Sequence, residues 1–453
     1  MTSVMTSRDA PADSTGRAPT APAAPRSREA ALAGDRPLRI LMPSYRSDPH
    51  TGGQGIYMRY ISRALADLGH KVDVISGPPY PELDPRIGLI KLPSLDLYAK
   101  PKEIIGLPKF PKDAALNAIN LREYITHITG GFGEPKSFGE RLAAYMRTRI
   151  GDYDVVHDNQ TLCWGLLDVA RMGLPVAGTI HHPITMDRRI AIAHADGIKL
   201  KLLIRRWYSF LSMQKKVARR LDPVIVVSES TKRDVVKDFG VAPERMRVVH
   251  HGINADDFHP MPEVKRVNNR IMAVASADVS LKGLIYLIRA YAQLLPARPD
   301  LELLVVSKLR EGPTSKLLDE LGLRNRVRFV SGISNDEMRR LYAEATIAVS
   351  PSVYEGFGFP AGEALACGVP VIATDGGSLP EVVGDAGVIV PARNPEALAQ
   401  AIGALLDDPD RRTALSIKGR KRIEDLFLWS RAAANVVAVY REAIARQSAR
   451  QAA

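Results

Sequence analysis

Short apolar segments recur along the whole chain, and stretches with a helical spacing of apolar residues separate them. In the first half they lie at 38–42, 72–75, 155–156, 176–180 and 224–227, and in the second half at 271–275, 301–306, 327–330, 347–349, 371–373 and 388–390. Short apolar strands that alternate with helices are typical of parallel sheets built from βαβ units. The pattern predicts an α/β protein whose two halves each form a doubly wound domain.

Two breaks in this pattern set the expected domain boundaries. Residues 1–36 are rich in Ala, Pro, Ser and Arg and contain no continuous apolar core, which indicates a disordered tail and not a signal peptide. Pro260, Pro262 and several polar residues interrupt the pattern near 258–268. We therefore expect an N-terminal Rossmann-like domain at 37–262 and a C-terminal one at 263–428.

Composition narrows the class of protein without naming a function. At 453 residues the chain is long enough for two or three domains with cores of their own. Its two cysteines, Cys163 and Cys367, lie far apart, which suits a reducing cytoplasm and not a disulfide framework. No window of about 18 apolar residues predicts a transmembrane helix. The formal net charge of +12 indicates attraction to anions, and a nucleotide, an anionic lipid surface or a nucleic acid would each satisfy it.

The most informative segment is Glu355–Glu363, in which two carboxylates flank a glycine-rich turn that leads into a helix. Gly356 and Gly358 allow the backbone to approach a ligand closely, and Pro360 suits a first helical position. The N–H groups and the positive dipole end of a helix start bind phosphate. Carboxylates accept hydrogen bonds from the hydroxyls of sugars and riboses. This combination predicts a nucleotide-sugar site.

Together with the Ala-Cys-Gly-Val-Pro-Val run at 366–371, this segment resembles the signature of the family-4 retaining glycosyltransferases. The resemblance covers nearly the whole chain after the first few dozen residues. It implies the GT-B architecture, in which two Rossmann-like domains face a cleft. The N-terminal domain would lie on the acceptor side and the C-terminal domain would bind the nucleotide sugar. The amphipathic segment 429–447 would be the final helix that packs back onto the N-terminal domain.

The resemblance also implies roles for individual residues. Glu363 would hold the ribose hydroxyls of the donor, and Glu355 would hold the sugar hydroxyls. Lys282, just past the first strand of the second half, would meet the diphosphate as a point charge. The backbone amides around Gly358 and Phe359 would stabilise the charge that builds on the departing diphosphate.

The sequence contains two histidine pairs. His181-His182 comes directly after the strand at 176–180, and the carboxyl ends of parallel strands are where open α/β sheets bind ligands. The family commonly has a histidine here that contacts the donor sugar or the acceptor; His181 is our first choice and His182 the second. The predicted catalytic set is therefore His181, Lys282 and Glu355. The segment His250–Asn254 resembles the Asn-Gly-Ile-Asp turn of the family, and we expect it to be structural.

Two glycine loops are further candidates for donor binding. Residues 51–55 follow the first strand and precede a helix, so Gly53 is expected near the donor and the acceptor. A dinucleotide site is the competing interpretation, but the spacing is not Gly-x-Gly-x-x-Gly and no acid ends the strand at 72–75. Gly376 and Gly377 follow the strand at 371–373, and they either approach the donor or only form a tight turn.

The chain departs from the family pattern at two places. Ser276-Ala277 stands where the family has Gly-Arg, so a phosphate-binding cation is missing, and Lys308 is a candidate replacement. Gly362 stands where the family has a larger apolar residue.

Residues 199–220 contain no acid between Lys199 and Arg220 and are predicted to form one amphipathic helix. Lys201, Arg205, Lys216 and Arg219 share one face, with apolar side chains roughly opposite. Such a helix binds an anionic membrane surface, or it packs on the domain core with a solvated basic face. Both interpretations stay open, and the first would place a cytoplasmic protein at the inner membrane face.

These observations predict a retaining hexosyltransferase that moves a sugar from a nucleoside-diphosphate sugar to an acceptor hydroxyl, with a lipid-linked or membrane-associated acceptor as one option. Asp152-Tyr153-Asp154 and Asp408-Pro409-Asp410 look like a strand entry and a loop, so we expect no metal site and no other cofactor. The alternatives are another GT-B enzyme, either a sugar-nucleotide epimerase or a phosphorylase. A nucleic-acid-binding protein is a remote alternative, because no recognised nucleic-acid module is visible.

Overall fold

The N-terminal half of the chain forms a seven-stranded parallel sheet with the strand order β3-β2-β1-β4-β5-β6-β7. The computed structural model describes residues 36–48, 53–97, 117–275 and 279–452. The strands are β1 (Arg39–Ser44), β2 (Lys71–Ser76), β3 (Gly88–Lys91), β4 (Val155–Asn159), β5 (Val176–Ile180), β6 (Val224–Val226) and β7 (Met246–Val248). All five strands expected in this half are confirmed. The two that the apolar pattern did not indicate, β3 and β7, are the edge strands, whose side chains are mostly only half-buried.

Helices cover both faces of this sheet because successive side chains of a strand point to opposite faces. Ile40 and Met42 pack with α1 and with the C-terminal helix α16 (Trp429–Ala452) on one face, while Leu41 packs with α3, α4, α7 and α8 on the other. The helices of this half are α1 (Gly53–Asp67), α2 (Ala118–Ile128), α3 (Glu134–Met146), α4 (Trp164–Arg171), α5 (Thr185–Ala193), α6 (Gly197–Trp207), α7 (Leu211–Ala218) and α8 (Glu229–Phe239).

The C-terminal half repeats the plan with a six-stranded parallel sheet in the order β10-β9-β8-β11-β12-β13. Its strands are β8 (Arg270–Val274), β9 (Glu302–Val306), β10 (Val327–Val330), β11 (Ile347–Ser350), β12 (Val371–Thr374) and β13 (Val388–Val390). Its helices are α9 (Leu284–Leu294), α10 (Pro313–Glu320), α11 (Asn335–Glu344), α12 (Phe359–Ala366), α13 (Leu379–Val383), α14 (Pro395–Leu406), α15 (Pro409–Leu426) and α16 (Trp429–Ala452). Every strand expected in this half is confirmed, and with them the prediction of two doubly wound domains.

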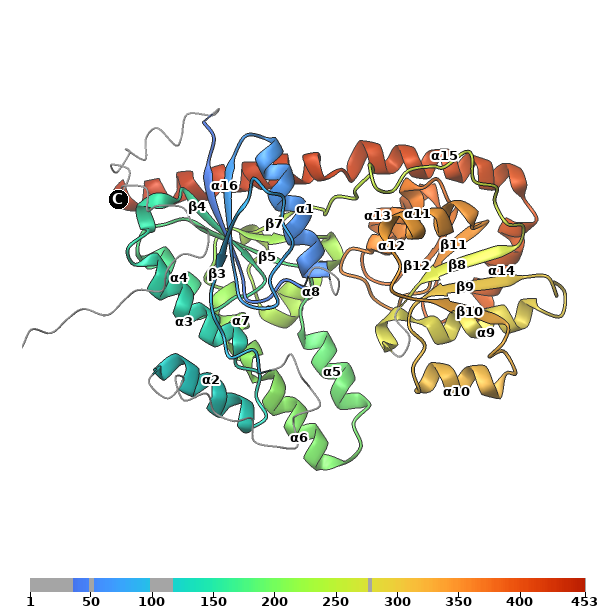
Figure 1. Cartoon of the computed structure of the whole chain (residues 1–453), viewed down its shortest axis with the longest axis horizontal. Helices are drawn as coiled ribbons and strands as arrows, with labels where there is room; N and C mark the ends of the chain where they lie inside the picture. Colours follow the sequence, from blue (N-terminus) through green and yellow to red (C-terminus); the bar gives the residue numbers. More distant parts are fainter. Residues whose placement is uncertain (1–35, 49–52, 98–116, 276–278, 453) are drawn as a thin grey trace, which may run out of the picture.

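The chain crosses between the two domains twice, at neighbouring points. The segment after β7 forms an isolated bridge between Ile253 and Leu428, and the Ile253 N–H donates to the Phe427 carbonyl at 2.6 Å. Helix α16 then runs back along the N-terminal domain (Figure 1) and buries Trp429 and Tyr440 against α1 and the first strands. Gly362 faces this crossing: a Cβ there would lie 2.6 Å from Ile253 Cδ1, which explains the absence of a larger residue.

Arg36, the last residue of the predicted tail, belongs to the N-terminal domain, where its guanidinium pairs with Asp154 at 2.9 Å. The rest of that tail lies outside the described residues.

The prediction of a single helix at 199–220 is wrong. Helix α6 ends at Trp207, a 3-10 turn spans Tyr208–Phe210, and α7 begins at Leu211. The two helices have different surroundings, since α7 buries Leu211 and Val217 in the core whereas α6 has no buried residue. No helix in the described ranges is long and apolar enough to cross a membrane.

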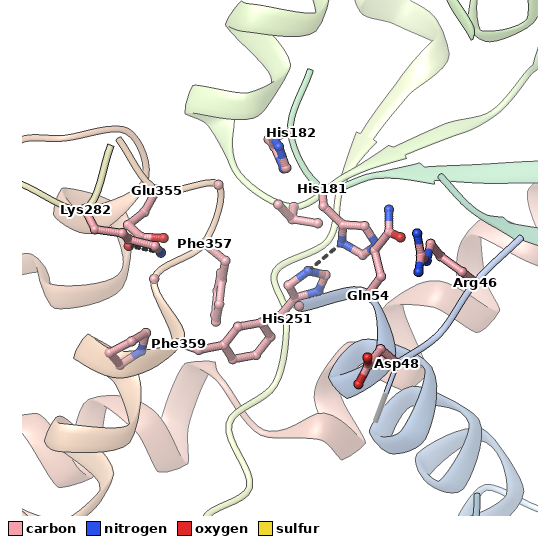
Figure 2. A pocket seen from close by; sticks show the side chains of 16 residues that line it. Arg46, Asp48, Gln54, His181, His182, His251, Lys282, Glu355, Phe357 and Phe359 are labelled. Atoms are coloured by element: carbon pink, nitrogen blue, oxygen red, sulfur yellow. Dashed lines mark hydrogen bonds and ion pairs between the residues drawn. The ribbon is translucent and has the colours of Figure 1, made fainter. Parts of the chain in front are cut away.

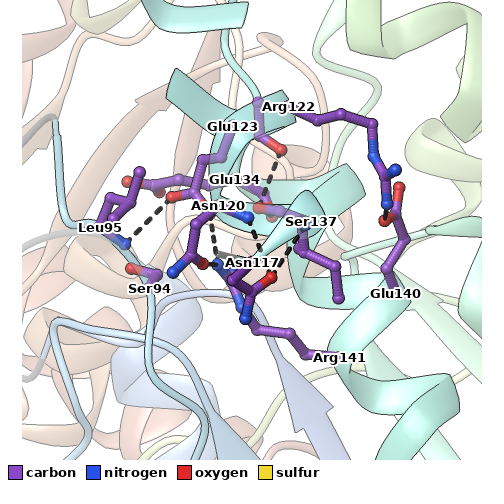
Figure 3. Close-up of polar contacts among 12 residues, drawn as sticks. Ser94, Leu95, Asn117, Asn120, Arg122, Glu123, Glu134, Ser137, Glu140 and Arg141 are labelled. Atoms are coloured by element: carbon purple, nitrogen blue, oxygen red, sulfur yellow. Dashed lines mark hydrogen bonds and ion pairs between the residues drawn. The ribbon is translucent and has the colours of Figure 1, made fainter. Parts of the chain in front are cut away.

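Helix α2 is attached to α3 by a buried ion pair (Figure 3). The fully buried Glu123 side chain pairs with Arg141 at 2.8 Å between Oε2 and Nη2, and Arg141 also donates to Asn120 Oδ1 at 2.6 Å. Just after α2, Thr129 Oγ1 accepts from Arg206 Nη2 at 2.6 Å. These contacts place α2 next to α6, at the lower end of the N-terminal domain in Figure 1.

Candidate functional site

A pocket of about 440 Å³ lies between the two domains (Figure 2). From the N-terminal domain and the segment that follows it, the lining residues are Arg46, Asp48, Gly53, Gln54, Gly55, His181, His182, Val227 and His251. From the C-terminal domain they are Lys282 and the segment 355–360. Loops that follow β1, β5, β8 and β11 supply most of these residues, as expected for carboxyl ends of parallel strands that face one another.

The segment 355–360 takes its shape from a left-handed glycine. Gly358 has a φ of 97° and precedes the first residue of α12, Phe359. A Cβ at Gly358 would also lie 2.8 Å from Leu379 Cδ2, so the position requires glycine both for its backbone angle and for its space. The predicted anion-binding helix start therefore faces the pocket, with Gly358, Phe359 and Pro360 in its lining.

Lys282 and Glu355, two of the predicted catalytic residues, form an ion pair in the pocket. The distance between Nζ and Oε1 is 2.7 Å, and Ser352 Oγ donates to the same oxygen at 2.7 Å. Lys282 ends the 3-10 turn Ser280–Lys282, and a Cβ at the following Gly283 would lie 2.0 Å from the Pro351 carbonyl oxygen. This close packing brings the turn against the Glu355 loop. The site thus holds a cation and a carboxylate side by side, at the start of α12.

Glu363 lies one turn further along α12 and is not part of the lining of this pocket. Its Oε2 accepts a hydrogen bond from Tyr342 Oη at 3.3 Å. Burial disfavours the charged form and raises the pKa of Glu363 to about 7. Its contact with a donor ribose stays a prediction.

Gly376 and Gly377, which follow β12, pack against the backbone of the loop that carries Glu355. A Cβ at Gly376 would lie 2.3 Å from the Ser352 carbonyl oxygen, and one at Gly377, whose φ is 67°, would lie 2.2 Å from the Glu355 carbonyl oxygen. Neither glycine lines the described pocket. This packing agrees with the tight-turn interpretation, and a direct donor contact stays a prediction.

Of the other predicted residues, Gly53 begins α1 at the pocket, where a Cβ would lie 3.7 Å from the Phe359 ring. Lys308 is exposed and does not line the pocket. Ser276-Ala277, and Thr51-Gly52 of the first glycine loop, lie outside the described residues.

His181 lies at the centre of a partly buried hydrogen-bond network, of which Figure 2 shows the contact with His251. Its Nε2 is 2.7 Å from Asn159 Oδ1, and its Nδ1 is 2.9 Å from His251 Nε2. Asn159 Nδ2 donates to the carbonyl oxygen of Gln54 at 3.2 Å, so the amide oxygen of Asn159 must face His181. His181 therefore carries its proton on Nε2, and its Nδ1 accepts a hydrogen bond from His251.

Both histidines are neutral. Burial, together with the neighbouring His251, His182 and His157, holds the pKa of His181 well below its usual 6.5. Burial lowers the pKa of His251 to about 3, with a smaller contribution from His250. Because both ring nitrogens of His181 are engaged, this geometry leaves no nitrogen free to transfer a proton. A contact between His181 and the sugar or the acceptor stays a prediction.

Three residues of this network were not predicted from the sequence as site residues. His251 was expected to be structural only, yet it lines the pocket and stacks on Phe359 with a centroid distance of 5.4 Å. Asn159 orients His181, and Gln160 holds the backbone of 181–182 by accepting from His181 N at 2.6 Å and donating to His182 O at 2.7 Å. The available signal was the polar run at 158–161 directly after the apolar segment 155–156, at the carboxyl end of a central strand.

Within the part of the chain that the structure describes, no cluster of three or more His, Cys, Asp or Glu side chains could hold a metal ion.

Comparisons with known proteins agree with this fold. The family model described as Glycosyltransferase Family 4 matches residues 51–257, and the model described as Glycosyl transferases group 1 matches residues 256–422. The MMP alpha-(1->4)-mannosyltransferase of Mycolicibacterium hassiacum is 47% identical to the chain, over 91% of the chain and 100% of that relative. A D-inositol 3-phosphate glycosyltransferase of Thermobispora bispora is 29% identical, over 87% of the chain and 91% of that relative.

Solved structures show the same architecture. Sucrose-phosphate synthase of Thermosynechococcus elongatus aligns with a TM-score of 0.67 and 26% identity, over 90% of the chain and 100% of that protein. HepE of Anabaena, solved in complex with UDP and glucose, aligns with a TM-score of 0.63 and 17% identity, over 88% of the chain and 98% of that protein. The family models and the 47% identical relative show that the chain belongs to the family-4 glycosyltransferases, and its two parallel-sheet domains, with the solved structures that match them, show the GT-B fold.

Proposed function

We propose that the chain is a retaining mannosyltransferase, which moves mannose from a nucleoside diphosphate to a hydroxyl of a sugar acceptor. The observation that carries the proposal is the pocket in which the Lys282–Glu355 pair and the start of α12 meet the acceptor-side domain. The choice of mannose and of a sugar acceptor follows the name of the 47% identical relative. The name of that relative prints an α-(1->4) linkage, and an α-linked donor would give such a product with retention of the anomeric configuration.

The residues on the C-terminal side of the pocket suit the departure of a diphosphate. The N–H groups at the start of α12 and the ammonium of Lys282 would stabilise the negative charge that develops on the leaving phosphate. Glu355, oriented by Lys282 and Ser352, would accept hydrogen bonds from the sugar hydroxyls. The acceptor hydroxyl would attack from the face that the diphosphate leaves, and a leaving phosphate oxygen would take its proton. This route needs no proton transfer by His181.

Product analysis tests the proposed reaction. The protein is incubated with labelled nucleoside-diphosphate sugars and short manno-oligosaccharides, and the products are analysed by mass and by NMR of the anomeric proton. We expect an acceptor longer by one α-linked mannose and free nucleoside diphosphate, with undiminished rate in excess EDTA. A new nucleotide sugar without transfer would indicate an epimerase, and a requirement for inorganic phosphate would indicate a phosphorylase. Loss of activity in EDTA would refute metal independence.

An anionic membrane surface remains a proposed partner, now restricted to α6. This helix exposes Ile198, Leu202 and Leu203 by 74%, 54% and 52%, and the adjacent α2 exposes Leu121, Ile125 and Ile128. Lys199, Lys201, Arg205 and Arg206 lie on α6, which contains no acid. Apolar side chains flanked by cations suit the boundary between lipid headgroups and acyl chains.

Sedimentation with vesicles that contain anionic lipid tests this partner. Replacing Lys199, Lys201 and Arg205 with glutamate should abolish sedimentation, because each basic residue near such a surface contributes about 1 kcal/mol. Lys216→Glu on α7 is the matched control and should sediment as the wild type does. Equal sedimentation of the triple variant, or none by the wild type, would remove the membrane from the proposal.

A further inference from the structure

The N-terminus of α8 is bound by a carboxylate from the opposite domain. Glu381 lies on α13, and its two carboxylate oxygens accept hydrogen bonds from the backbone N–H groups of Glu229 and Ser230, each at 2.8 Å. These N–H groups belong to the first turn of α8, where the helix itself supplies no acceptor. A carboxylate is also the favoured charge at the positive end of a helix dipole. The contact thus joins the two domains through two charge-assisted hydrogen bonds.

The same end of α8 contacts both walls of the pocket. Ser228 caps the helix by accepting from Thr231 N at 2.9 Å, and its hydroxyl donates to the Gly356 carbonyl at 3.0 Å. Thr231 Oγ1 donates to the His181 carbonyl at 3.3 Å. The Ser228 and Thr231 side chains are fully buried. The separation of Gly356 from His181 therefore depends on how close α8 lies to the C-terminal domain.

Glu381 is held firmly on its own domain. Arg422 on α15 donates from Nη2 to the Glu381 carbonyl and from Nε to the Val382 carbonyl, each at 2.8 Å. The N–H of Ser378 donates to the Glu355 carbonyl at 3.0 Å, which ties the start of α13 to the Glu355 loop. A movement of α13 away from α8 would therefore carry the Glu355 loop away from His181.

We propose that Glu381 is a positioning residue that latches the two domains in the closed arrangement. By binding the N-terminus of α8 it favours the state in which the Glu355 loop lies against His181. Its effect on turnover rests on the proposed function, whereas its effect on the domain arrangement does not. In this proposal Glu381 contacts neither the donor nor the acceptor. It affects turnover by raising the fraction of molecules in the closed arrangement.

Small-angle X-ray scattering of the full chain, with and without saturating UDP and GDP, tests the latch alongside steady-state kinetics. Glu381→Ala leaves the two N–H groups to water, so we expect a larger radius of gyration than that of the wild type. We expect kcat to fall about tenfold, the factor that corresponds to a loss of about 1.4 kcal/mol for the closed state. Glu381→Gln keeps an acceptor oxygen without the charge. Its radius of gyration and its kcat should lie between those of the wild type and those of Glu381→Ala. Glu381→Arg places a cation at the dipole and should open the molecule furthest.

Glu229→Ala is the matched control, because it removes an acidic side chain from the same helix end and leaves the backbone N–H in the contact. It should keep the radius of gyration and kcat of the wild type. Equal radii for the wild type and Glu381→Ala would overturn the latch, even where kcat falls. A larger radius in a protein whose wild type transfers no sugar would support the latch and contradict the proposed function.

Discussion

A Lys282→Ala variant is expected to lose about 10²- to 10³-fold in kcat/KM for its nucleoside-diphosphate sugar, the usual consequence of removing one preorganised group that stabilises developing charge. Lys282 lines the pocket within 2.7 Å of Glu355, so its removal has two effects. The leaving phosphate loses a cation, and Glu355 loses the partner that orients it. Steady-state kinetics over a range of donor concentrations measure the change, and most of it should lie in kcat because the charge develops in the transition state.

Lys308→Ala is the control for this variant. Lys308 is a second lysine of the same domain at the carboxyl end of a neighbouring strand, but it is exposed and lies outside the pocket. We expect its kcat/KM to stay within about twofold of the wild type. A melting temperature measured for both variants excludes unfolding as the cause. If the two lysine variants had equal kcat/KM, Lys282 would not be the phosphate-binding cation.

The second large effect is expected at Glu363. If its carboxylate holds the ribose hydroxyls, Glu363→Ala removes hydrogen bonds to a charged acceptor and should weaken donor binding by about 10- to 100-fold, which corresponds to about 1.5–3 kcal/mol. Tyr342→Phe is the matched control, since it removes the hydroxyl that donates to Glu363 at 3.3 Å and keeps the carboxylate. Isothermal titration calorimetry measures the affinity of both variants for the donor. Unchanged affinity in Glu363→Ala would show that the ribose binds elsewhere.

The pH dependence of donor binding gives an independent test of the same residue. Burial raises the pKa of Glu363 to about 7, so the free protein holds this group protonated at lower pH. The ionised carboxylate is the better acceptor for ribose hydroxyls. Donor affinity should therefore rise as the pH increases through about 7, and this rise should be absent in Glu363→Gln. A wild type whose affinity is the same at pH 5.5 and pH 8.5 would contradict the assignment.

The two parallel sheets were predictable because their strands are buried on both faces. In Val176–Ile180 and Val224–Val226 every residue is buried, and such strands appear in the sequence as short apolar runs. The edge strand Gly88–Lys91, which has no fully buried residue, was not predicted, although Leu89 and Ile90 are apolar. The break between α6 and α7 was also unpredictable, because the apolar spacing continues through Tyr208–Phe210 and only packing on the core separates the two helices.

The candidate site was predictable where its chemistry lies in consecutive residues. Glu355, Gly358 and Phe359 belong to one motif, and the motif indicates both the helix start and its ligand. Lys282 was identified by its place after a strand, but its pairing with Glu355 joins residues 73 positions apart. The His181–His251 contact joins residues 70 positions apart, and nothing next to His251 in the sequence indicates it.

By itself, the sequence determines the class of fold, the family and the loop proposed to meet the donor, because apolar periodicity and motifs are properties of neighbouring residues. Only the tertiary structure decides that His181 is a neutral histidine with both nitrogens engaged, and that Glu381 reaches Ser230, 151 positions earlier in the chain. The first arrangement joins the ends of strands of the N-terminal sheet, and the second joins the two domains. Their geometry depends on how distant segments of the chain pack, which no local pattern of residues records.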